Sequence, residues 1–390
     1  MQDLSINNMD VAVGLKPKTG NSVFSPAETN SSDTLPPSFR HPSERVMDSI
    51  QRFFQGNNTT ADYGIHANNL AAGIYRYSNL PEENIFIFSD TDQPAGQIIK
   101  TLTAPGDTVL VCQPIDDNTF PEESSNDIDI QYFDSTTPLM ADPEGIINAV
   151  TAKTRVIYLA NPNLCTGTIY GIDEIETIID TTNNVKIILD ETYYEYYGTS
   201  LAGLIRQYDN ITVIRSFSAA FGLDELPCSY ILASPENIAS IKHTYTEDNI
   251  SPLSMVAAAA VLTDHEYLKS RILTVKENMT YLAIRLRGIG IPVLTTPADF
   301  LLAEVANPVQ VISELRSTGI EVRKIDNDNQ LQNYISIPII DDNYSTNIIE
   351  TFMHMPRQLY VHKPTGPKLI LHRSEEHQIE PVNSDETVEV

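Results

Sequence analysis

The sequence predicts an α/β protein in which a three-layer α/β/α sandwich with a mostly parallel sheet is followed by a smaller C-terminal α+β domain. Short apolar, β-branched runs alternate with helical segments between about residues 84 and 217, and turn residues separate them. A long amphipathic segment over residues 265–290 then precedes a strand–helix–strand–strand pattern in residues 292–339. Alternation of this kind is typical of parallel strands covered by helices.

Each element of the sandwich has its own pattern. The first helix is predicted over residues 43–54, where Ser43 is the N-cap and Glu44 lies in the first turn. Apolar runs that fit buried strands follow at residues 84–88, 108–112, 128–133, 154–160, 185–191, 210–217 and 230–234. Helical segments lie among them at residues 94–104, 142–151 and 173–182. The long helix ends at Gly288 and Gly290, as helix C-termini often do.

Composition narrows the class of protein. The chain carries 52 acidic and 25 basic side chains, a formal net charge of −27, with the acidic groups spread along its length. Nucleic-acid binding depends on clustered lysine and arginine, so we expect no nucleic-acid partner. The three cysteines have neither metal-ligand nor disulfide spacing, and no signal peptide or membrane span is visible. These features favour a cytoplasmic protein that binds no metal and no membrane.

The ends of the chain differ from its middle. Residues 1–42 are rich in Ser, Thr, Asn and Pro, which predicts an irregular leader. Residues 356–390 are acidic and contain proline, and we expect this tail to be disordered. Between the two ends we predict a large domain over residues 43–270 and a small domain over residues 271–355.

The segment VIRSFSAAFGLDELPCSYILAS, which starts at Val213, reads as strand, polar turn and strand. The hydroxyl groups of Ser216 and Ser218 lie at the end of the first strand, where they are able to cradle an anion. Arg215 is the only lysine, arginine or histidine in the segment. The turn therefore has the hydroxyls of an anion site without an amine or a general base.

Three motifs in order along the chain resemble those of the fold-type I, pyridoxal-phosphate-dependent aminotransferases of class I/II, in the branch of histidinol-phosphate aminotransferase. They are ANPNLCTGTIYG (160–171), IILDETYYEYYG (187–198) and RSFSAAFGLDELPCSY (215–230). The resemblance extends over about residues 63–352. It implies the fold-type I architecture, a pyridoxal phosphate cofactor, and a dimer that pairs through the large domain with sites at the subunit boundary.

The resemblance also implies roles for individual residues. Asp190 matches the carboxylate that keeps the pyridine nitrogen protonated, and Tyr193 matches the phenol that contacts the ring oxygen. Tyr63 matches the tyrosine that reaches the phosphate from the opposite subunit. The residues that the resemblance places on the phosphate from within the same chain are Ser216, Ser218, Ser89 and Thr91.

The most consequential departure from the family pattern is at Ala219, which stands where the family has the lysine that binds the cofactor covalently. No lysine occurs between Lys186 and Lys242, so no neighbour in the sequence replaces it. That lysine also moves the proton during transamination, and such proton transfer contributes typically 10²–10⁴-fold. Ordinary transamination is therefore not expected.

Other family positions have changed as well. Leu164 and Cys165 replace an asparagine and a proline, Pro227 replaces the arginine that clamps the phosphate, Asp116 replaces a stacking aromatic, and Tyr334 replaces the arginine that holds the substrate carboxylate. The lost arginine, asparagine and stack together amount to about 3–6 kcal/mol. We therefore expect weak or lost binding of pyridoxal phosphate, and Tyr334 and Asp116 become the candidates for substrate contact.

Simpler explanations exist for several of these residues. Ser216 and Ser218 are also ordinary turn residues, and Asp190 is also a typical loop cap. The tyrosines around Tyr193 fit strand and loop packing better than chemistry, and the cysteines fit inert side chains. At the carboxyl ends of parallel strands, however, ligand sites are common, which favours a relict cofactor pocket.

Three hypotheses for function remain. The first is a pseudoenzyme that acts as a partner subunit, as a homodimer or as a heterodimer in which Tyr63 completes the site of a lysine-containing paralogue. The second is a repurposed biosynthetic enzyme that uses Asp190, Tyr193 and Asp116 or Cys228 in other chemistry. The alternative is a pyridoxal-phosphate-binding enzyme of the histidinol-phosphate aminotransferase type, acting on an amino-acid-like small molecule.

Overall fold

The computed structural model describes residues 42–56, 63–89, 94–115, 128–135, 139–182, 185–244, 250–325 and 330–361. The leader up to residue 41, the tail from residue 362, and the candidate residues Thr91 and Asp116 lie outside the described residues. The described parts of the chain all belong to one compact unit, residues 35–390.

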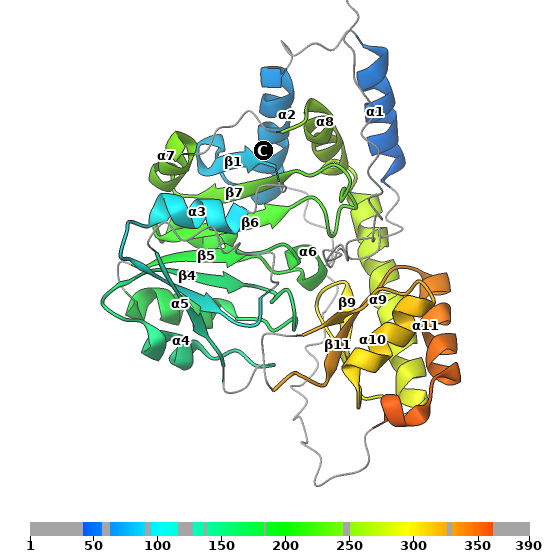
Figure 1. The fold of residues 1–390 in the computed structure, drawn as a ribbon. Helices are drawn as coiled ribbons and strands as arrows, with labels where there is room; N and C mark the ends of the chain where they lie inside the picture. The colour runs from blue at the N-terminus through cyan, green and yellow to red at the C-terminus, as the bar shows by residue number, and fades with distance from the viewer. Residues whose placement is uncertain are drawn as a thin grey trace, which may run out of the picture. The chain divides into compact units, whose positions relative to one another are not determined.

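A seven-stranded sheet forms the large domain (Figure 1). Its strand order is β1-β7-β6-β5-β4-β2-β3. The five strands from β6 to β3 are parallel, whereas β7 is antiparallel to both β6 and β1. The strands are β1 Ile85–Phe88, β2 Thr108–Cys112, β3 Asp129–Phe133, β4 Thr154–Ala160, β5 Lys186–Asp190, β6 Ile211–Ser216 and β7 Ser229–Ala233. Each predicted apolar run overlaps one of these strands, and the pairings confirm the mostly parallel sheet.

Helices cover both faces of this sheet and complete the three layers. Side chains of α3 (Pro94–Leu102) and α7 (Pro235–Thr244) pack in one apolar cluster with alternate strand residues such as Ile188. The opposite face packs in a larger cluster with helices α1 Glu44–Gln55, α2 Tyr63–Ser78, α4 Pro143–Ala149, α5 Ile172–Thr181 and α8 Pro252–Val261. The two-residue periodicity of the strands thus sends neighbouring side chains into different layers.

Four short elements connect these layers. They are η2 Glu82–Asn84, η5 Ala202–Arg206, the helix α6 Tyr194–Tyr197, and the turn between β6 and β7. The tyrosine run, which we expected in strand and loop packing, forms the helix α6 instead. Gly198 ends that helix in the left-handed region at φ +94°, as a helix C-terminus favours.

The smaller domain begins with the long helix α9, His265–Gly288, whose N-cap Asp264 accepts a hydrogen bond from the backbone N of Tyr267. A four-stranded antiparallel sheet follows in the order β10-β11-β9-β8. Figure 1 shows β9 and β11 beside the helices α9, α10 and α11. The elements after α9 are β8 Val293–Thr295, β9 Phe300–Glu304, α10 Pro308–Ser317, β10 Arg323–Lys324, β11 Tyr334–Pro338 and α11 Asp342–His354.

The folded chain continues beyond the predicted end of the small domain at residue 355. A 3₁₀ helix, η7, spans Arg357–Leu359. Tyr360 is buried, with its ring edge-on to Phe352 of α11 at a centroid separation of 5.5 Å. The part of the predicted tail from residue 362 lies outside the described residues.

A membrane span was not expected from the sequence. Among the helices that the structure describes, none combines the length and the apolar character that crossing a membrane requires.

Candidate functional site

Two of the predicted site residues, Asp190 and Ser216, end neighbouring parallel strands at one edge of the sheet. Strand β1 runs in the same direction as β6, because β7 lies between them and is antiparallel to both. Ser229 of β7 pairs with Phe88 on one side and with Ser216 on the other. Phe88 therefore lies level with Ser216, and Ser89 follows it one residue further toward the carboxyl end. Ligand sites of open α/β sheets lie outside this edge.

Asp190 ends strand β5 at this edge, and its carboxylate is held by three donors. Oδ2 accepts a 2.7 Å hydrogen bond from the hydroxyl of Tyr158 on β4. Oδ1 accepts from the backbone N of Thr192 at 3.0 Å and from its hydroxyl at 2.6 Å. A carboxylate offers about four acceptor positions. With the described residues, Oδ1 uses two and Oδ2 uses one, so Oδ2 keeps one position for a ligand N–H.

The serines of the turn after β6 contact each other. Ser216 is buried, and its Oγ accepts a 3.0 Å hydrogen bond from the backbone N of Ser218. This bond is the one expected of a serine in an ordinary turn. Gly222, at φ +68°, donates its backbone N–H to the carbonyl of Ser218 at 2.9 Å and closes the turn. Contact of these hydroxyls with a phosphate stays a prediction.

Ala219 lies inside this turn with 5% of its surface exposed. Its carbonyl oxygen accepts a 3.1 Å hydrogen bond from the hydroxyl of Tyr196 on α6, and a 3.5 Å bond from Nη2 of Arg271 on α9. The two lysines that flank the segment in the sequence, Lys186 and Lys242, lie elsewhere. Lys186 is at the opposite end of β5, about 13 Å along the strand from Asp190.

The ammonium group of Lys186 is engaged at that far end, where it donates a 2.5 Å hydrogen bond to Oδ1 of Asn237 on α7. Lys242 lines a groove of about 360 Å³ along the edge strand β1. Neither lysine therefore takes the place of an amine at Ala219.

Tyr193 and Tyr334 lie where the two domains meet. Both pack against a small apolar cluster that includes Phe300 and Leu302 of β9. The rings of Tyr193 and Phe300 are in edge contact at 5.9 Å. Burial, and then the neighbouring Glu304 carboxylate, raises the pKa of Tyr334. The structure thus brings together two residues that the sequence analysis placed on the cofactor and on the substrate.

Tyr63 occupies a different place within the chain. It begins helix α2 and lines the β1 groove together with Phe86 and Lys242. Its predicted role concerned the opposite subunit, and this role stays a prediction. Thr91 and Asp116, also predicted at the site, fall outside the described residues.

The loop after β4 is organised by Asn163 rather than by Leu164. Oδ1 of Asn163 accepts from the backbone N of Cys165 and of Thr166, each at 2.9 Å. Its Nδ2 donates to the carbonyl of Pro114, after β2, at 2.9 Å. These bonds tie two neighbouring strand ends together, while Leu164 and Cys165 are half-buried.

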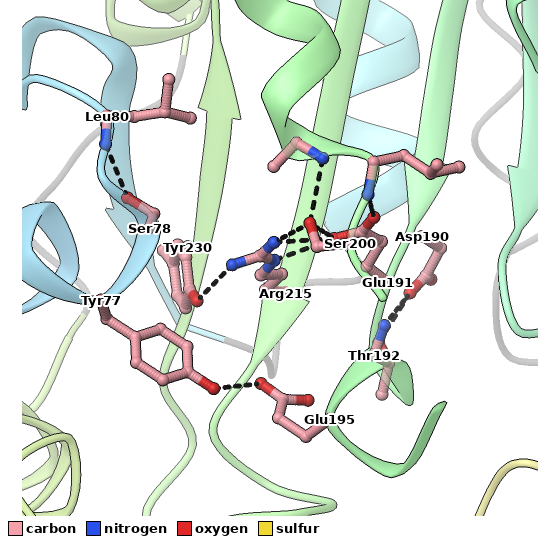
Figure 2. A network of polar contacts seen from close by, with 12 residues as sticks. Tyr77, Ser78, Leu80, Asp190, Glu191, Thr192, Glu195, Ser200, Arg215 and Tyr230 are labelled. Carbon is pink, nitrogen blue, oxygen red and sulfur yellow. Dashed lines mark hydrogen bonds and ion pairs between the residues drawn. The ribbon is translucent and has the colours of Figure 1, made fainter. Parts of the chain in front are cut away.

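A second polar cluster, which the sequence analysis missed, lies on the opposite face of the same two strands (Figure 2). Because side chains alternate, Glu191 points away from Asp190, and Arg215 points away from Ser216. Arg215 and Glu191 are 3% and 1% exposed, and Nε and Nη2 of the guanidinium lie 3.0 Å and 2.9 Å from Oε2 of Glu191. The hydroxyl of Ser200 bonds both groups.

Aromatic side chains enclose this ion pair. The guanidinium of Arg215 stacks on the ring of Tyr194 at 3.8 Å, and Nη1 donates to the hydroxyl of Tyr230 at 3.4 Å. Figure 2 shows Arg215 between Tyr230 and Ser200. A signal was present in the sequence: an arginine inside the apolar run ITVIRSF must be buried, and a buried charge needs a partner.

Glu195 of α6 adds an acidic group to the second cluster. Its Oε1 accepts a long, 3.5 Å hydrogen bond from the hydroxyl of Tyr77 on α2. Burial raises the pKa of Glu195 to about 8, against the opposing effect of Arg215. Burial therefore favours the neutral form of this carboxyl group, while Arg215 pairs with Glu191.

The Asp190 carboxylate at the edge of the sheet fits the pyridine ring of a pyridoxal phosphate group. A protonated pyridine nitrogen needs a carboxylate acceptor, and Oδ2 of Asp190 has an acceptor position that the described residues leave available. The fixed orientation of the carboxylate, held from β4 and from Thr192, suits it to one direction of approach. The site therefore offers the ring contact but, at Ala219, no amine.

Comparisons with known proteins agree on one family. The model of the family "Aminotransferase class I and II" matches residues 31–342. Histidinol-phosphate aminotransferase of Ruminiclostridium cellulolyticum is 28% identical over 275 residues, which cover 69% of this chain and 76% of that protein. Dihydroxyacetone phosphate transaminase of Campylobacter jejuni is 28% identical over 288 residues, covering 72% and 78%.

Solved structures show the same fold. Histidinol-phosphate aminotransferase from Sinorhizobium meliloti, in complex with pyridoxal 5′-phosphate, superposes with a TM-score of 0.73 at 20% identity, over 81% of this chain and 89% of that one. Aspartate aminotransferase from Thermotoga maritima superposes with a TM-score of 0.71 at 18% identity, over 82% and 90%. At these identities the likeness concerns the fold, and it confirms the fold-type I prediction.

Proposed function

Because this chain belongs to the class I and II aminotransferase family, we propose that it binds pyridoxal phosphate at the sheet edge around Asp190 and acts there on an amino-acid-like small molecule, of the type that histidinol-phosphate aminotransferases use. The observation that carries this proposal is the Asp190 carboxylate, buried, oriented by three donors and left with one acceptor position. The curated relatives, named as transaminases, favour this enzyme over a pseudoenzyme.

The residues of the chain divide the work as follows. Asp190 accepts the N–H of the cofactor ring, and Tyr158 and Thr192 keep its carboxylate in place. When bound, the cofactor supplies an electron sink for a carbanion next to the substrate nitrogen. The hydroxyls of Ser216 and Ser218 donate to the phosphate. Tyr193 borders the ring oxygen and packs on the small domain through Phe300.

Ala219 limits this activity, and it favours a second candidate function. With no amine at this position, the cofactor is held without a covalent bond to the turn, and proton transfer falls to another group. A chain that binds the cofactor but transfers no amino group would act as a partner subunit. In that case we propose pairing with a second copy or with a lysine-containing paralogue, to which Tyr63 contributes.

A cofactor titration tests the proposal. Wild-type protein is titrated with pyridoxal phosphate and followed by visible absorbance, beside the variants Asp190→Asn and Ala219→Lys. We expect wild type to bind, Asp190→Asn to bind more weakly, and Ala219→Lys alone to be trapped on the protein by borohydride. Absence of binding by wild type overturns the proposal.

An amino-transfer assay then separates the two candidate functions. Histidinol phosphate with a 2-oxo acid is the substrate pair, and Ala219→Lys is the positive control for an intact pocket. Transfer by wild type supports the enzyme. Binding without transfer, together with copurification of a paralogue from the native host, supports the partner subunit.

A further inference from the structure

The guanidinium of Arg271 lies beside the turn that lacks the lysine. Arg271 is in the second turn of α9, and its Nη2 reaches the carbonyl oxygen of Ala219 at 3.5 Å. Ala219 directly follows Ser218. A cation carried by the small domain's first helix thus contacts the turn in which the family resemblance places a phosphate-binding hydroxyl.

The guanidinium of Arg271 has few hydrogen-bond partners among the described residues, although its Nε is buried. Its Nε is buried and donates to no described residue. A guanidinium has five N–H donors, and here the described residues supply only the 3.5 Å bond to Ala219, which is at the limit of a hydrogen bond. No carboxylate among the described residues forms an ion pair with it. A buried, unsatisfied donor on a charged group is unfavourable without a ligand.

Arg215, a buried arginine with a structural role, has many more partners around its guanidinium than Arg271 has. Arg215 has a carboxylate, two hydroxyls and an aromatic ring around it. Arg271 has a carbonyl oxygen at long range and a buried donor without an acceptor. The planar fork of a guanidinium suits a tetrahedral oxyanion, which accepts two parallel N–H bonds.

We propose that Arg271 supplies the cation of a phosphate-monoester site at the Ser218–Ala219 turn, in place of the arginine that Pro227 removes. This inference rests on the proposed function, because the phosphate expected there is that of pyridoxal phosphate. The phosphate of a substrate such as histidinol phosphate has the same chemistry. A helix of the small domain thereby takes over a contact that the β6–β7 turn no longer provides.

Binding ratios test the proposal without an activity measurement. Affinities for pyridoxal phosphate and for pyridoxal, which lacks the phosphate, are measured for wild type, Arg271→Gln and Arg271→Lys. The control is Arg285→Gln, an exposed arginine on the same helix that changes the net charge equally. We expect Arg271→Gln to lower the preference for the phosphorylated form about tenfold to a hundredfold, Arg271→Lys to lower it less, and Arg285→Gln to leave it unchanged.

Two further arms identify the phosphate and separate this inference from the proposed function. If Arg271→Gln changes the ratio of histidinol phosphate to histidinol binding instead, the site serves the substrate's phosphate. If wild type binds no cofactor, the proposed function fails. The inference then stands only if inorganic phosphate raises the midpoint of thermal unfolding of wild type and Arg285→Gln more than that of Arg271→Gln.

The opposite results overturn the inference. They are an unchanged preference of Arg271→Gln for the phosphorylated form of both the cofactor and the substrate, or an equal loss in Arg285→Gln. Circular dichroism checks that each variant is folded. If Arg271→Gln does not fold, Arg271→Lys and the double variant Arg271→Lys/Ser218→Ala replace it. A phosphate at this turn is ruled out if Arg271→Lys keeps the wild-type preference for the phosphorylated form and the double variant keeps the wild-type response to inorganic phosphate.

Discussion

The hydroxyl of Tyr158 donates a 2.7 Å hydrogen bond to Oδ2 of Asp190 across the neighbouring strands β4 and β5. Both residues are buried, with 0% and 7% of their surfaces exposed. The bond fixes the one carboxylate oxygen that has an acceptor position to offer. It therefore links the core of the sheet directly to the proposed contact with the cofactor ring.

Removal of this hydroxyl tests that link. We expect Tyr158→Phe to lower the free energy of unfolding by about 1 kcal/mol, because Asp190 loses one buried donor. The affinity for pyridoxal phosphate should fall as well, since the carboxylate is less firmly oriented. Urea unfolding and the absorbance titration measure the two effects. Tyr132→Phe, at an exposed position of β3, should change neither value.

The buried ion pair of Arg215 and Glu191 should be costly to break on one side only. Arg215→Met leaves the Glu191 carboxylate buried without its cation, and we expect a loss of about 3–5 kcal/mol in the free energy of unfolding. A double variant that adds Glu191→Gln should recover part of the loss. The control is Arg155→Met, whose exposed pair with Asp107 at 3.4 Å should contribute no more than about 1 kcal/mol. Equal losses at the two arginines would contradict the buried pairing.

Stability should depend on pH through Glu195. Its pKa in the folded chain is raised to about 8, mainly by burial, while Arg215, Glu191 and Tyr194 also act on it. Between the ordinary pKa of a glutamate and about 8, the folded state binds a proton that the unfolded state has released. The free energy of unfolding contributed by this group is therefore fully present at low pH and falls as pH rises to about 8.

The slope expected from one such proton is at most about 1.4 kcal/mol per pH unit. Urea unfolding of wild type and of Glu195→Gln at several pH values measures it, because the variant lacks the titrating group. The difference between the two proteins should grow in favour of Glu195→Gln from pH 5 to pH 8. A constant difference would mean that Glu195 is ionised in the folded chain.

The segment after residue 355 should contribute to stability. Tyr360 is buried against Phe352, so we expect Tyr360→Ala to lower the free energy of unfolding by about 3 kcal/mol. Met353→Ala removes an exposed side chain from the preceding helix and serves as the control. Thermal or urea unfolding compares them, and similar small losses in both would place the end of the folded domain near residue 355.

The sandwich was predictable because its strands are continuous apolar runs, a pattern that does not depend on distant residues. Helix α2 was missed because Gly64, Gly73 and a weak apolar stripe obscure the helical period of its sequence. Helix α8 was missed because alanines and other apolar residues occur on every side of the helix, so its sequence has no polar face to reveal a period. The tyrosine run was assigned to strand and loop because aromatic residues favour strands, whereas the chain turns there into α6.

Site residues were harder to predict than the fold. Asp190 and Ser216 were found because each ends a strand in a motif. Arg215 was noticed without a role, since its partner Glu191 lies 24 residues away and only the sheet brings them together. Arg271 gave no signal at all, because an arginine on an amphipathic helix is ordinary and only the packing of α9 on the turn distinguishes it.

The pleat of β5 and β6 makes sequence parity a guide to the effect of substitution. Asp190 and Ser216 have even numbers, and their side chains lie at the proposed ligand site. Glu191 and Arg215 have odd numbers, and their side chains form the buried ion pair on the opposite face. A systematic scan of these strand ends should therefore give two separable phenotypes at adjacent codons. Even positions would change ligand affinity in a folded protein, and odd positions would change how much folded protein a cell accumulates.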